Sequence, residues 1–255
     1  MPLELVTVPC LADNYAYLIH DPETGQTAVI DVPEVGPILG ALNAHQWRLT
    51  DILITHHHDD HIQGVDTLRA QTGAMVLGAA ADAHRLPRLD LALDEHAAFS
   101  LGREMARVIE VPGHTIGHIA FHFPDSHLCF TADSLMAGGC GRLFEGSARM
   151  MHASLQKLAA LPPDTLICSG HEYTATNLRF ALTLEPNNPA LISRAAEVAE
   201  KRAHGRPTVP VPLQVELDTN PYLRAHLPAL KTAVGLPDAD DVTVFAEIRA
   251  RKDKF

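Results

Sequence analysis

The stretch LITHHHDDHIQG, residues 53–64, passes abruptly from apolar to densely polar. Positions 56–61 hold four histidines and two aspartates, directly after the apolar run DILIT. This pattern indicates a strand that ends in a polar loop, and the spacing typical of an amphipathic helix resumes near Ile62. Open α/β structures place their sites in strand-to-helix loops of this kind.

The spacing of these side chains favours a metal site. His56 and His58 are two residues apart, so an extended backbone directs both imidazoles to the same side. Asp60 and His61 follow as the chain turns, and can reach a second point nearby. Imidazole and carboxylate groups suit zinc and similar metals. A capped helix start with solvated histidines is the alternative, and the neighbours His57 and Asp59 are expected not to bind.

Three further donors follow other apolar runs along the chain. His114 lies in VPGHTIGH after the strand-like run ARVIEV, Asp133 ends the run HLCFTAD, and His171 follows DTLICSG. Each comes just after its run, so all three are predicted to meet at one edge of a sheet. This repetition distinguishes a site from a merely histidine-rich composition. Most other histidines are expected to be structural, with His118 a candidate to orient a ligand.

The composition is that of a globular protein. Of 255 residues, 46% are apolar and 20% charged, and the formal net charge of −11 disfavours nucleic acid as a partner. No apolar run is long enough to span a membrane and the start does not resemble a signal peptide, so a cytoplasmic protein is expected. The cysteines form no CxxC pair and read as small buried hydrophobes, although the glycine-rich surroundings of Cys140 leave its role open.

The chain is predicted to divide near residue 172. Strand and helix patterns are mixed over residues 1–172, whereas residues 173–255 show mainly helical spacing and no clear strand. Within the second part, RPTVPVPLQVELDTNP, residues 206–221, contains four prolines and is predicted to cross the structure in an extended form.

The ordered set of motifs resembles the metallo-β-lactamase superfamily. The resemblance implies an α+β fold, an αββα sandwich with a dinuclear metal site at one edge, followed here by a C-terminal helical domain. Carried over by position, one metal would be held by His56, His58 and His114, the other by Asp60, His61 and His171, with Asp133 bridging the two.

Within that superfamily the chain is most similar to glyoxalase II, the hydroxyacylglutathione hydrolases. The stretches GGCGRLFEG, GHEYTATNLRFA, VELDTNPYLR and RARKDKF carry this similarity. The glutathione contacts of that family map onto Arg142, Leu143, Phe144, Tyr173, Arg249 and Lys252. Phe144 stands where the family often has tyrosine, so any contact that needs the tyrosine hydroxyl is missing.

The resemblance implies hydrolysis of S-(2-hydroxyacyl)glutathione thioesters such as S-D-lactoylglutathione, giving glutathione and D-lactate in the second step of methylglyoxal detoxification. A metal-bridging hydroxide would attack the thioester, and Asp60 would orient it. Residues 1–172 would form the catalytic domain and residues 173–255 the substrate-binding domain. Two divalent ions per chain are expected, zinc first, with iron or manganese as alternatives. A cytoplasmic monomer is expected.

Other readings remain open at this point. The histidine motif also fits a β-lactamase, a lactonase, a tRNA-processing nuclease or an iron-dependent persulfide dioxygenase. The acidic charge disfavours the nuclease, and the cytoplasmic start disfavours the β-lactamase. A lactonase or the dioxygenase would have no reason to keep the C-terminal motifs. A non-catalytic zinc protein is a further alternative, but structural zinc sites are usually closed and rich in cysteine.

Overall fold

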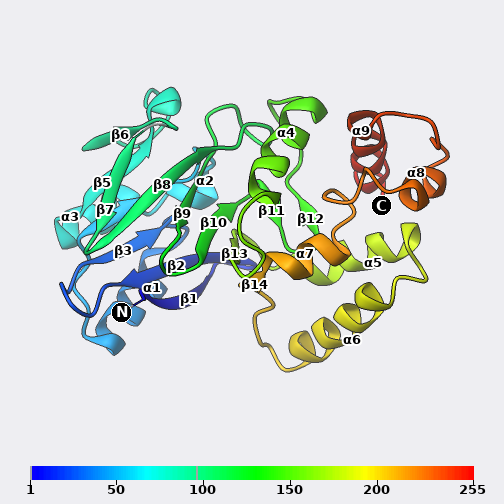
Figure 1. The fold of residues 1–255 in the computed structure, drawn as a ribbon. Helices are drawn as coiled ribbons and strands as arrows, with labels where there is room; N and C mark the ends of the chain where they lie inside the picture. Colours follow the sequence, from blue (N-terminus) through cyan, green and yellow to red (C-terminus); the bar gives the residue numbers. More distant parts are fainter. Residues whose placement is uncertain (1, 96) are drawn as a thin grey trace.

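Two six-stranded sheets, packed face to face, form the centre of the molecule (Figure 1). The computed structural model describes residues 2–95 and 97–255. The first sheet follows chain order: β1 (Glu4–Cys10), β2 (Asn14–His20), β3 (Thr27–Ile30), β4 (Asp51–Leu53), β5 (Met75–Ala79) and β6 (Leu91–Leu93). The second runs β14 (Val211–Pro212), β13 (Leu166–Ser169), β10 (Leu128–Ala132), β9 (Ile119–Phe123), β8 (Glu104–Glu110) and β7 (Ala98–Leu101). A small hairpin joins β11 (Leu135–Met136) to β12 (Gly139–Cys140).

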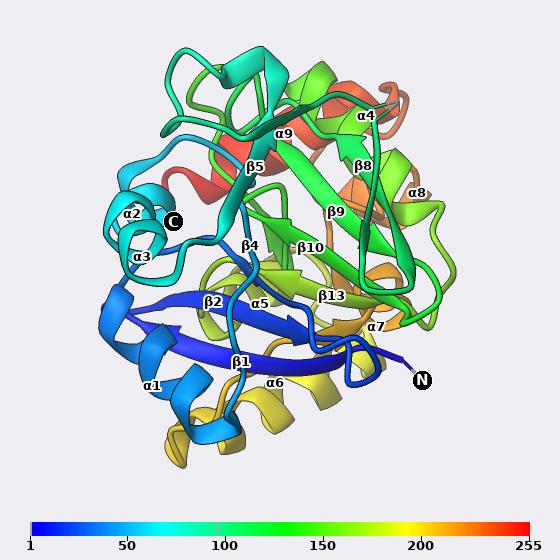
Figure 2. The same cartoon turned by 90° about the vertical axis from the view of Figure 1, so that its left-hand side faces the viewer.

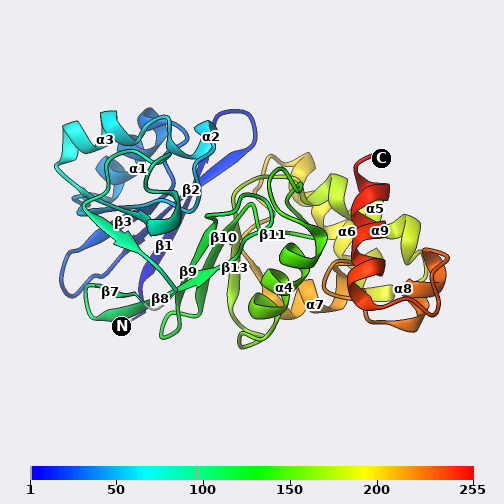
Figure 3. The same ribbon diagram turned by 90° about the horizontal axis from the view of Figure 1, so that it is seen from above.

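Helices cover the outer face of each sheet (Figures 2 and 3). The first sheet is covered by α1 (Val35–His45) and α3 (Val65–Thr72), with the short α2 (Asp59–Ile62) and the 3-10 turn η1 (Ala80–Asp82) at its edge. The second is covered by α4 (Ala148–Ala159), and α9 (Asp241–Lys252) packs against α4. Around them lie α5 (Thr174–Leu184), α6 (Pro189–Ala203), α7 (Leu213–Thr219) and α8 (Pro228–Ala233).

The alternation of side chains along the strands explains the layers. On β9, Phe121 and Phe123 face the first sheet and pack with Tyr17 and Phe130 in the central core. Ala120, which comes just before Phe121, faces the opposite way, into the cluster under α4 and α9. Because each central strand is apolar on both faces, it must be covered on both sides. The expected αββα sandwich with a C-terminal helical part is therefore confirmed.

The expectation for the proline-rich segment was wrong in part. Residues 213–219 form helix α7, because the four prolines lie outside it, and Pro212 occupies the position before its first turn. Residues 211–212 form strand β14, which pairs antiparallel with β13. The expectation that no strand follows residue 173 was therefore also wrong, because residues 211–212 add a short strand to the second sheet.

The direction of the strands brings the predicted donors to one edge. Strands β8 and β10 both pair antiparallel with β9, and β10 pairs parallel with β13, so β8, β10 and β13 run the same way. The loops after their carboxyl ends carry His114, Asp133 and His171, and the loop after β4 carries the histidine motif. All four cysteines are free and buried, as expected. None of the helices described has the length and apolar character to cross a membrane.

Helix α9 is held against α4 and Tyr222 by Phe245, which offers a test of this packing. Phe245 is fully buried and packs edge-on against Tyr222, with ring centroids 5.3 Å apart. Phe245→Ala is expected to lower the free energy of unfolding in urea by about 3–5 kcal/mol, because it removes a buried ring and leaves a cavity. Thr243→Ala, at an exposed position of the same helix, should change it by less than about 0.5 kcal/mol. A loss below 1 kcal/mol for Phe245→Ala would contradict this packing.

Candidate metal centre

Three histidines form the first group of donors. His56, His58 and His114 each place a ring nitrogen within 4.8 Å of the other two. Nδ1 of His58 lies 3.1 Å from Nε2 of His56 and 3.0 Å from Nε2 of His114. The Nδ1 atoms of His56 and His114 have other hydrogen-bond partners. Nδ1 of His56 lies 3.0 Å from the Thr55 hydroxyl, and Nδ1 of His114 lies 2.8 Å from the Arg142 carbonyl oxygen. The Nε2 lone pairs of His56 and His114 therefore face a common point.

A second group lies beside the first. Nε2 of His61 is 3.3 Å from Nε2 of His171, and Oδ2 of Asp60 is 3.5 Å from the same His171 nitrogen. Nδ1 of His171 bonds to Asp13 at 3.0 Å, which turns its Nε2 inward. Asn14 donates to Oδ2 of Asp60 at 3.0 Å and so holds that carboxylate in place.

Asp133 lies between the two groups. Its Oδ2 is 3.5 Å from Nε2 of His114 and 3.3 Å from Nε2 of His171, while its Oδ1 is 3.6 Å from Nε2 of His61. The register of β10 with β13 shifts just before it, and Ala132 adopts a φ of +41°, which redirects the following side chain. The sequence-predicted ligands of both metals are thus brought together at one point of the structure.

Asp31 is a supporting residue that the sequence analysis missed. It is buried at the end of β3, and its Oδ2 accepts from His61 Nδ1 and from the Thr55 hydroxyl, each at 2.8 Å. Its φ of +58° is one that aspartate tolerates better than most residues. The run TAVIDV ends in this aspartate, so the rule that found the other donors could have found it too. The sequence analysis also missed Asp13 and Asn14, which bond to His171 and Asp60.

The side chains of the site fit divalent cations. Oδ1 of Asp133 is buried, and no hydrogen-bond partner for it exists among the residues described. Burial alone would raise the pKa of Asp133, but His61 and His171 hold that pKa well below its usual range. Burial and the neighbouring imidazoles keep the pKa of His56 low, so its ring is neutral. An ionised carboxylate with a free oxygen, set among ring nitrogens that converge on it, is a donor set suited to metal binding.

The backbone approaches this centre closely at Gly170. A Cβ there would lie 2.5 Å from Oδ1 of Asp133 and 2.9 Å from Cε1 of His61, so only glycine fits. His118 stacks on the His56 ring, with centroids 4.6 Å apart, and so supports a donor without being one. Asp59 is exposed in the first turn of α2 and belongs to none of the donor groups found among the described residues.

A cavity of about 590 Å³ opens beside the centre. Besides the donors, its walls include Arg142, Phe144, Tyr173, Arg249 and Lys252, five of the six residues expected to contact glutathione. The sixth, Leu143, packs against the cluster under α4 and does not line the cavity, so any contact from it must come through its backbone.

Positive charge gathers at this cavity. Burial lowers the pKa of Lys252, and the guanidinium groups of Arg249, Arg142 and Arg179 lower it further. Arg179, on α5, did not figure in the sequence analysis, although it lies within the stretch GHEYTATNLRFA. This cluster reverses the overall acidity of the protein locally and suits an anionic ligand.

Arg249 and Lys252 differ in how free they are to bind. Arg249 is buried, donates to the Cys140 carbonyl oxygen at 3.0 Å and pairs with Asp253 at 2.8 Å. Lys252 is partly buried against Phe180 and, in the described part of the chain, pairs with no carboxylate. Lys252 is therefore the more available cation, whereas Arg249 joins α9 to the last residue of β12.

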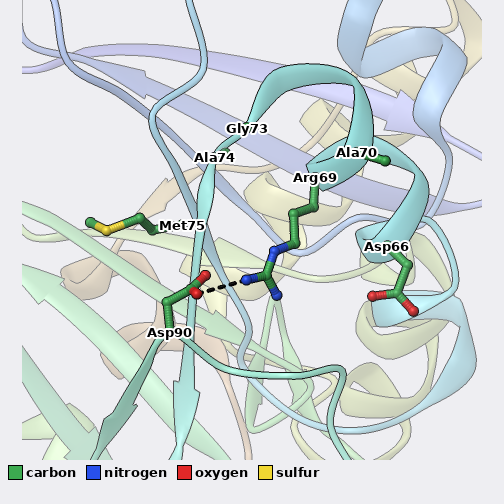
Figure 4. Close-up of a pocket in the computed structure, with 7 residues that line it drawn as sticks. All are labelled: Asp66, Arg69, Ala70, Gly73, Ala74, Met75 and Asp90. Carbon is green, nitrogen blue, oxygen red and sulfur yellow. Dashed lines mark hydrogen bonds and ion pairs between the residues drawn. The ribbon is translucent and has the colours of Figure 1, made fainter.

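A second depression, of about 370 Å³, lies between α3 and β5 and shares no lining residue with the cavity beside the donors (Figure 4). Its cation Arg69 is already paired with Asp90 at 2.6 Å and also donates to the Arg88 carbonyl oxygen. With its charge satisfied and no histidine or cysteine in its walls, this depression offers no comparable chemistry.

Comparison with known proteins agrees with this geometry. Residues 13–171 match the model of the metallo-beta-lactamase superfamily, and residues 172–255 match that of the hydroxyacylglutathione hydrolase C-terminus. A protein of Cereibacter sphaeroides named hydroxyacylglutathione hydrolase is 66% identical over 255 residues, the full length of both chains. The chain belongs to the hydroxyacylglutathione hydrolase family.

Solved structures place this family within the wider fold. The BLEG-1 B3 metallo-beta-lactamase aligns with a TM-score of 0.67 at 20% identity, over 86% of this chain and 99% of that one, which shows a shared fold. TTHA1623, solved in a di-iron-bound form, aligns with a TM-score of 0.56 at 28% identity, over 66% of this chain and 91% of its own.

The role of Asp31 can be tested by metal affinity. Asp31→Asn keeps the shape of the side chain and tolerates the backbone conformation, but removes the charge that orients His61. The affinity for zinc, measured by competition with a chromophoric chelator, is expected to fall about 10–100-fold. Asp51→Asn changes a buried carboxylate at the opposite end of β4 and should leave the affinity unchanged. Equal affinities of Asp31→Asn and the parent protein would refute the orienting role.

Proposed function

We propose that this protein hydrolyses S-(2-hydroxyacyl)glutathione thioesters, such as S-D-lactoylglutathione, to glutathione and a 2-hydroxy acid. In cells this would be the second step of methylglyoxal detoxification. The observation that carries the proposal is the juxtaposition of two groups of metal donors with a cavity lined by cations. Family membership supports the same reaction, since the relative from Cereibacter sphaeroides bears this enzyme's name.

The proposed metal ligands are the seven donors described above: His56, His58 and His114 for one ion, Asp60, His61 and His171 for the other, and Asp133 for both. Divalent cations held there would supply a water of lowered pKa, about 7 in comparable sites, and positive charge for the thioester carbonyl. Zinc is the proposed metal, and the di-iron form of TTHA1623 keeps iron as an alternative.

The remaining chemistry belongs to the side chains of this chain. Asp60 lines the cavity, and Asn14 holds its Oδ2, so this carboxylate is placed to accept a hydrogen bond from the attacking water and orient it. Neither a serine nor a cysteine nucleophile is required. Cys140 lines the cavity, but burial raises the pKa of its thiol to about 11, which keeps the thiol protonated and unreactive.

Glutathione carries two carboxylates, which the cation cluster would bind. Lys252 provides a point charge and Arg142 a planar fork of donors. Tyr173 stacks on His171, with ring centroids 4.7 Å apart, and Phe144 lies edge-on to His58, so both rings border the path to the metals. Phe144 has no hydroxyl, and the substrate contact there is therefore apolar.

In this proposal the two parts of the chain have different roles. Residues 1–172 would supply the catalytic centre, and residues 173–255 most of the substrate contacts. The proposal includes action as a monomer. A cytoplasmic location is supported by four cysteines that are all free and buried, as is usual in a reducing compartment.

The reaction itself is tested by thiol release. The zinc-loaded protein is expected to release free thiol from S-D-lactoylglutathione and to leave a lactone and a β-lactam unchanged in parallel assays. Asp133→Asn should lower kcat by at least about 1000-fold, because the charged link between the two donor groups is lost. No thiol release by protein carrying its full complement of metal would sink the proposal.

The substrate contacts are tested by separating KM from kcat. Lys252→Ala is expected to raise KM for the thioester about 10-fold with kcat within about threefold, since the cation binds a part of the substrate remote from the reacting bond. Lys254→Ala, exposed on the same terminal stretch, is the matched control and should change neither value. An unchanged KM for Lys252→Ala would exclude this contact.

A further inference from the structure

A network of charged side chains lies beside the metal centre and has no part in the proposed hydrolysis. Arg85 donates from Nη1 to Oε1 of Glu145 at 2.5 Å and from Nη2 to Oδ1 of Asp82 at 2.6 Å. His57 completes the network, with Nδ1 3.2 Å from Oδ2 of Asp82 and Nε2 3.6 Å from Oε1 of Glu145. These four residues are called the Arg85 clasp below.

The clasp joins the loops that supply the first group of donors. His57 belongs to the histidine loop itself. Oε2 of Glu145 accepts the backbone N–H of Ile116 at 2.8 Å, in the loop that follows β8. The carboxylate of Asp82 lies against Gly117 in the same loop, where a Cβ would come within 2.1 Å of it. Three loops are thereby fastened together outside the metal centre.

The fourth partner is the 142–146 loop, which is held at two points. Near its start, the carbonyl oxygen of Arg142 accepts from Nδ1 of His114 at 2.8 Å. At its end, Gly146 donates its N–H to the carbonyl oxygen of Gly113 at 3.1 Å, and the clasp holds the residue before it. Among the described residues, the middle of the loop makes no other hydrogen bond or ion pair comparable to these.

Phe144 occupies that middle. Its side chain is 62% exposed, so burial does not fix its position. Its ring nevertheless lies edge-on to His58, with centroids 5.6 Å apart, and 5.3 Å from the His114 ring, at the wall of the cavity. The position of this ring must come from the backbone of the loop, and hence from its anchors.

We propose that the Arg85 clasp is a positioning device that holds Phe144, and through it the substrate, over His58 and His114. This inference rests on the proposed thioester hydrolysis for its substrate, but the geometry of the clasp stands apart from it. Arg85, Asp82, Glu145 and His57 are positioning residues, since none of them lines the cavity. His57 thus has a role that is distinct from that of a metal ligand.

The ion pair between Arg85 and Glu145 is suited to hold the loop permanently. Both terminal nitrogens of Arg85 reach Glu145, giving a two-pronged bond. The hydrogen bond from Arg85 lowers the pKa of Glu145 to about 2, so the carboxylate stays ionised at neutral pH. Since both side chains are about 70% covered, the pair is only partly screened by water.

Two single variants and their combination test the clasp in the zinc-loaded enzyme. Arg85→Ala and Glu145→Gln are each expected to raise KM for S-D-lactoylglutathione about 10-fold, with kcat within about threefold and two metals retained, because the loop loosens while the ligands stay in place. The KM of the double variant should be no higher than that of the single variant with the higher KM, since all three variants lose the same interaction. Because Glu145→Gln keeps the side-chain volume, it still tests the clasp if Arg85→Ala fails to fold.

Hydrogen exchange supplies a readout that needs no substrate. Amides in residues 113–117 and 141–147 are expected to exchange at least about 10-fold faster in both variants, while the central strands keep their protection. Arg69→Ala is the matched control, because the Arg69–Asp90 pair of Figure 4 has similar length and exposure but lies far from the centre. It should alter neither exchange in these segments nor KM.

The outcomes separate the two proposals. Unchanged exchange or unchanged KM in Arg85→Ala and Glu145→Gln, additive effects in the double variant, or equal effects in Arg69→Ala would overturn the clasp. If the parent enzyme releases no thiol, the proposed function fails, and the exchange comparison alone still decides whether the clasp holds the loop.

Discussion

The buried carboxylate of Asp133 sets the requirement that the rest of the centre meets. It is ionised, nearly inaccessible to water, and has one oxygen without a hydrogen bond within the part of the chain described. An uncompensated buried charge costs several kcal/mol, so positive groups must surround it. His61 and His171 lie nearest to it, and Asp133 and Asp13 raise the pKa of His171 to about 9 despite its burial. Divalent cations would meet the same need more completely.

The fold satisfies this requirement through strand direction. Three strands of the second sheet end on one edge, and β4 of the first sheet ends opposite them, so four loops converge without any one of them having to be long. The C-terminal helices then close one side of the centre and bring cations to an otherwise acidic protein. The metal donors, the cations at the cavity and the Arg85 clasp are thus all arranged around Asp133.

The sequence predicted the strands before the donors, the mainly helical C-terminal part and the approach of the donors to one another, because each donor follows an apolar run. It did not predict α7, since prolines at its flanks were taken to exclude a helix throughout the segment. Nor did it predict the orienting partners: Asp31 and Asp13 bond to residues 30 and 158 positions away, and such pairing has no local signal. Arg85 and Glu145 are likewise 60 positions apart. The metal roles and substrate contacts themselves stay predictions.

The most direct test of a centre built around Asp133 is a titration of the metal-free protein with zinc, followed by thiol release from S-D-lactoylglutathione. If Asp133 links two ions, activity should rise to its maximum at two equivalents of zinc per chain, and Asp133→Asn should bind them more weakly and stay inactive. A maximum at one equivalent, or full activity without added metal, would contradict the account.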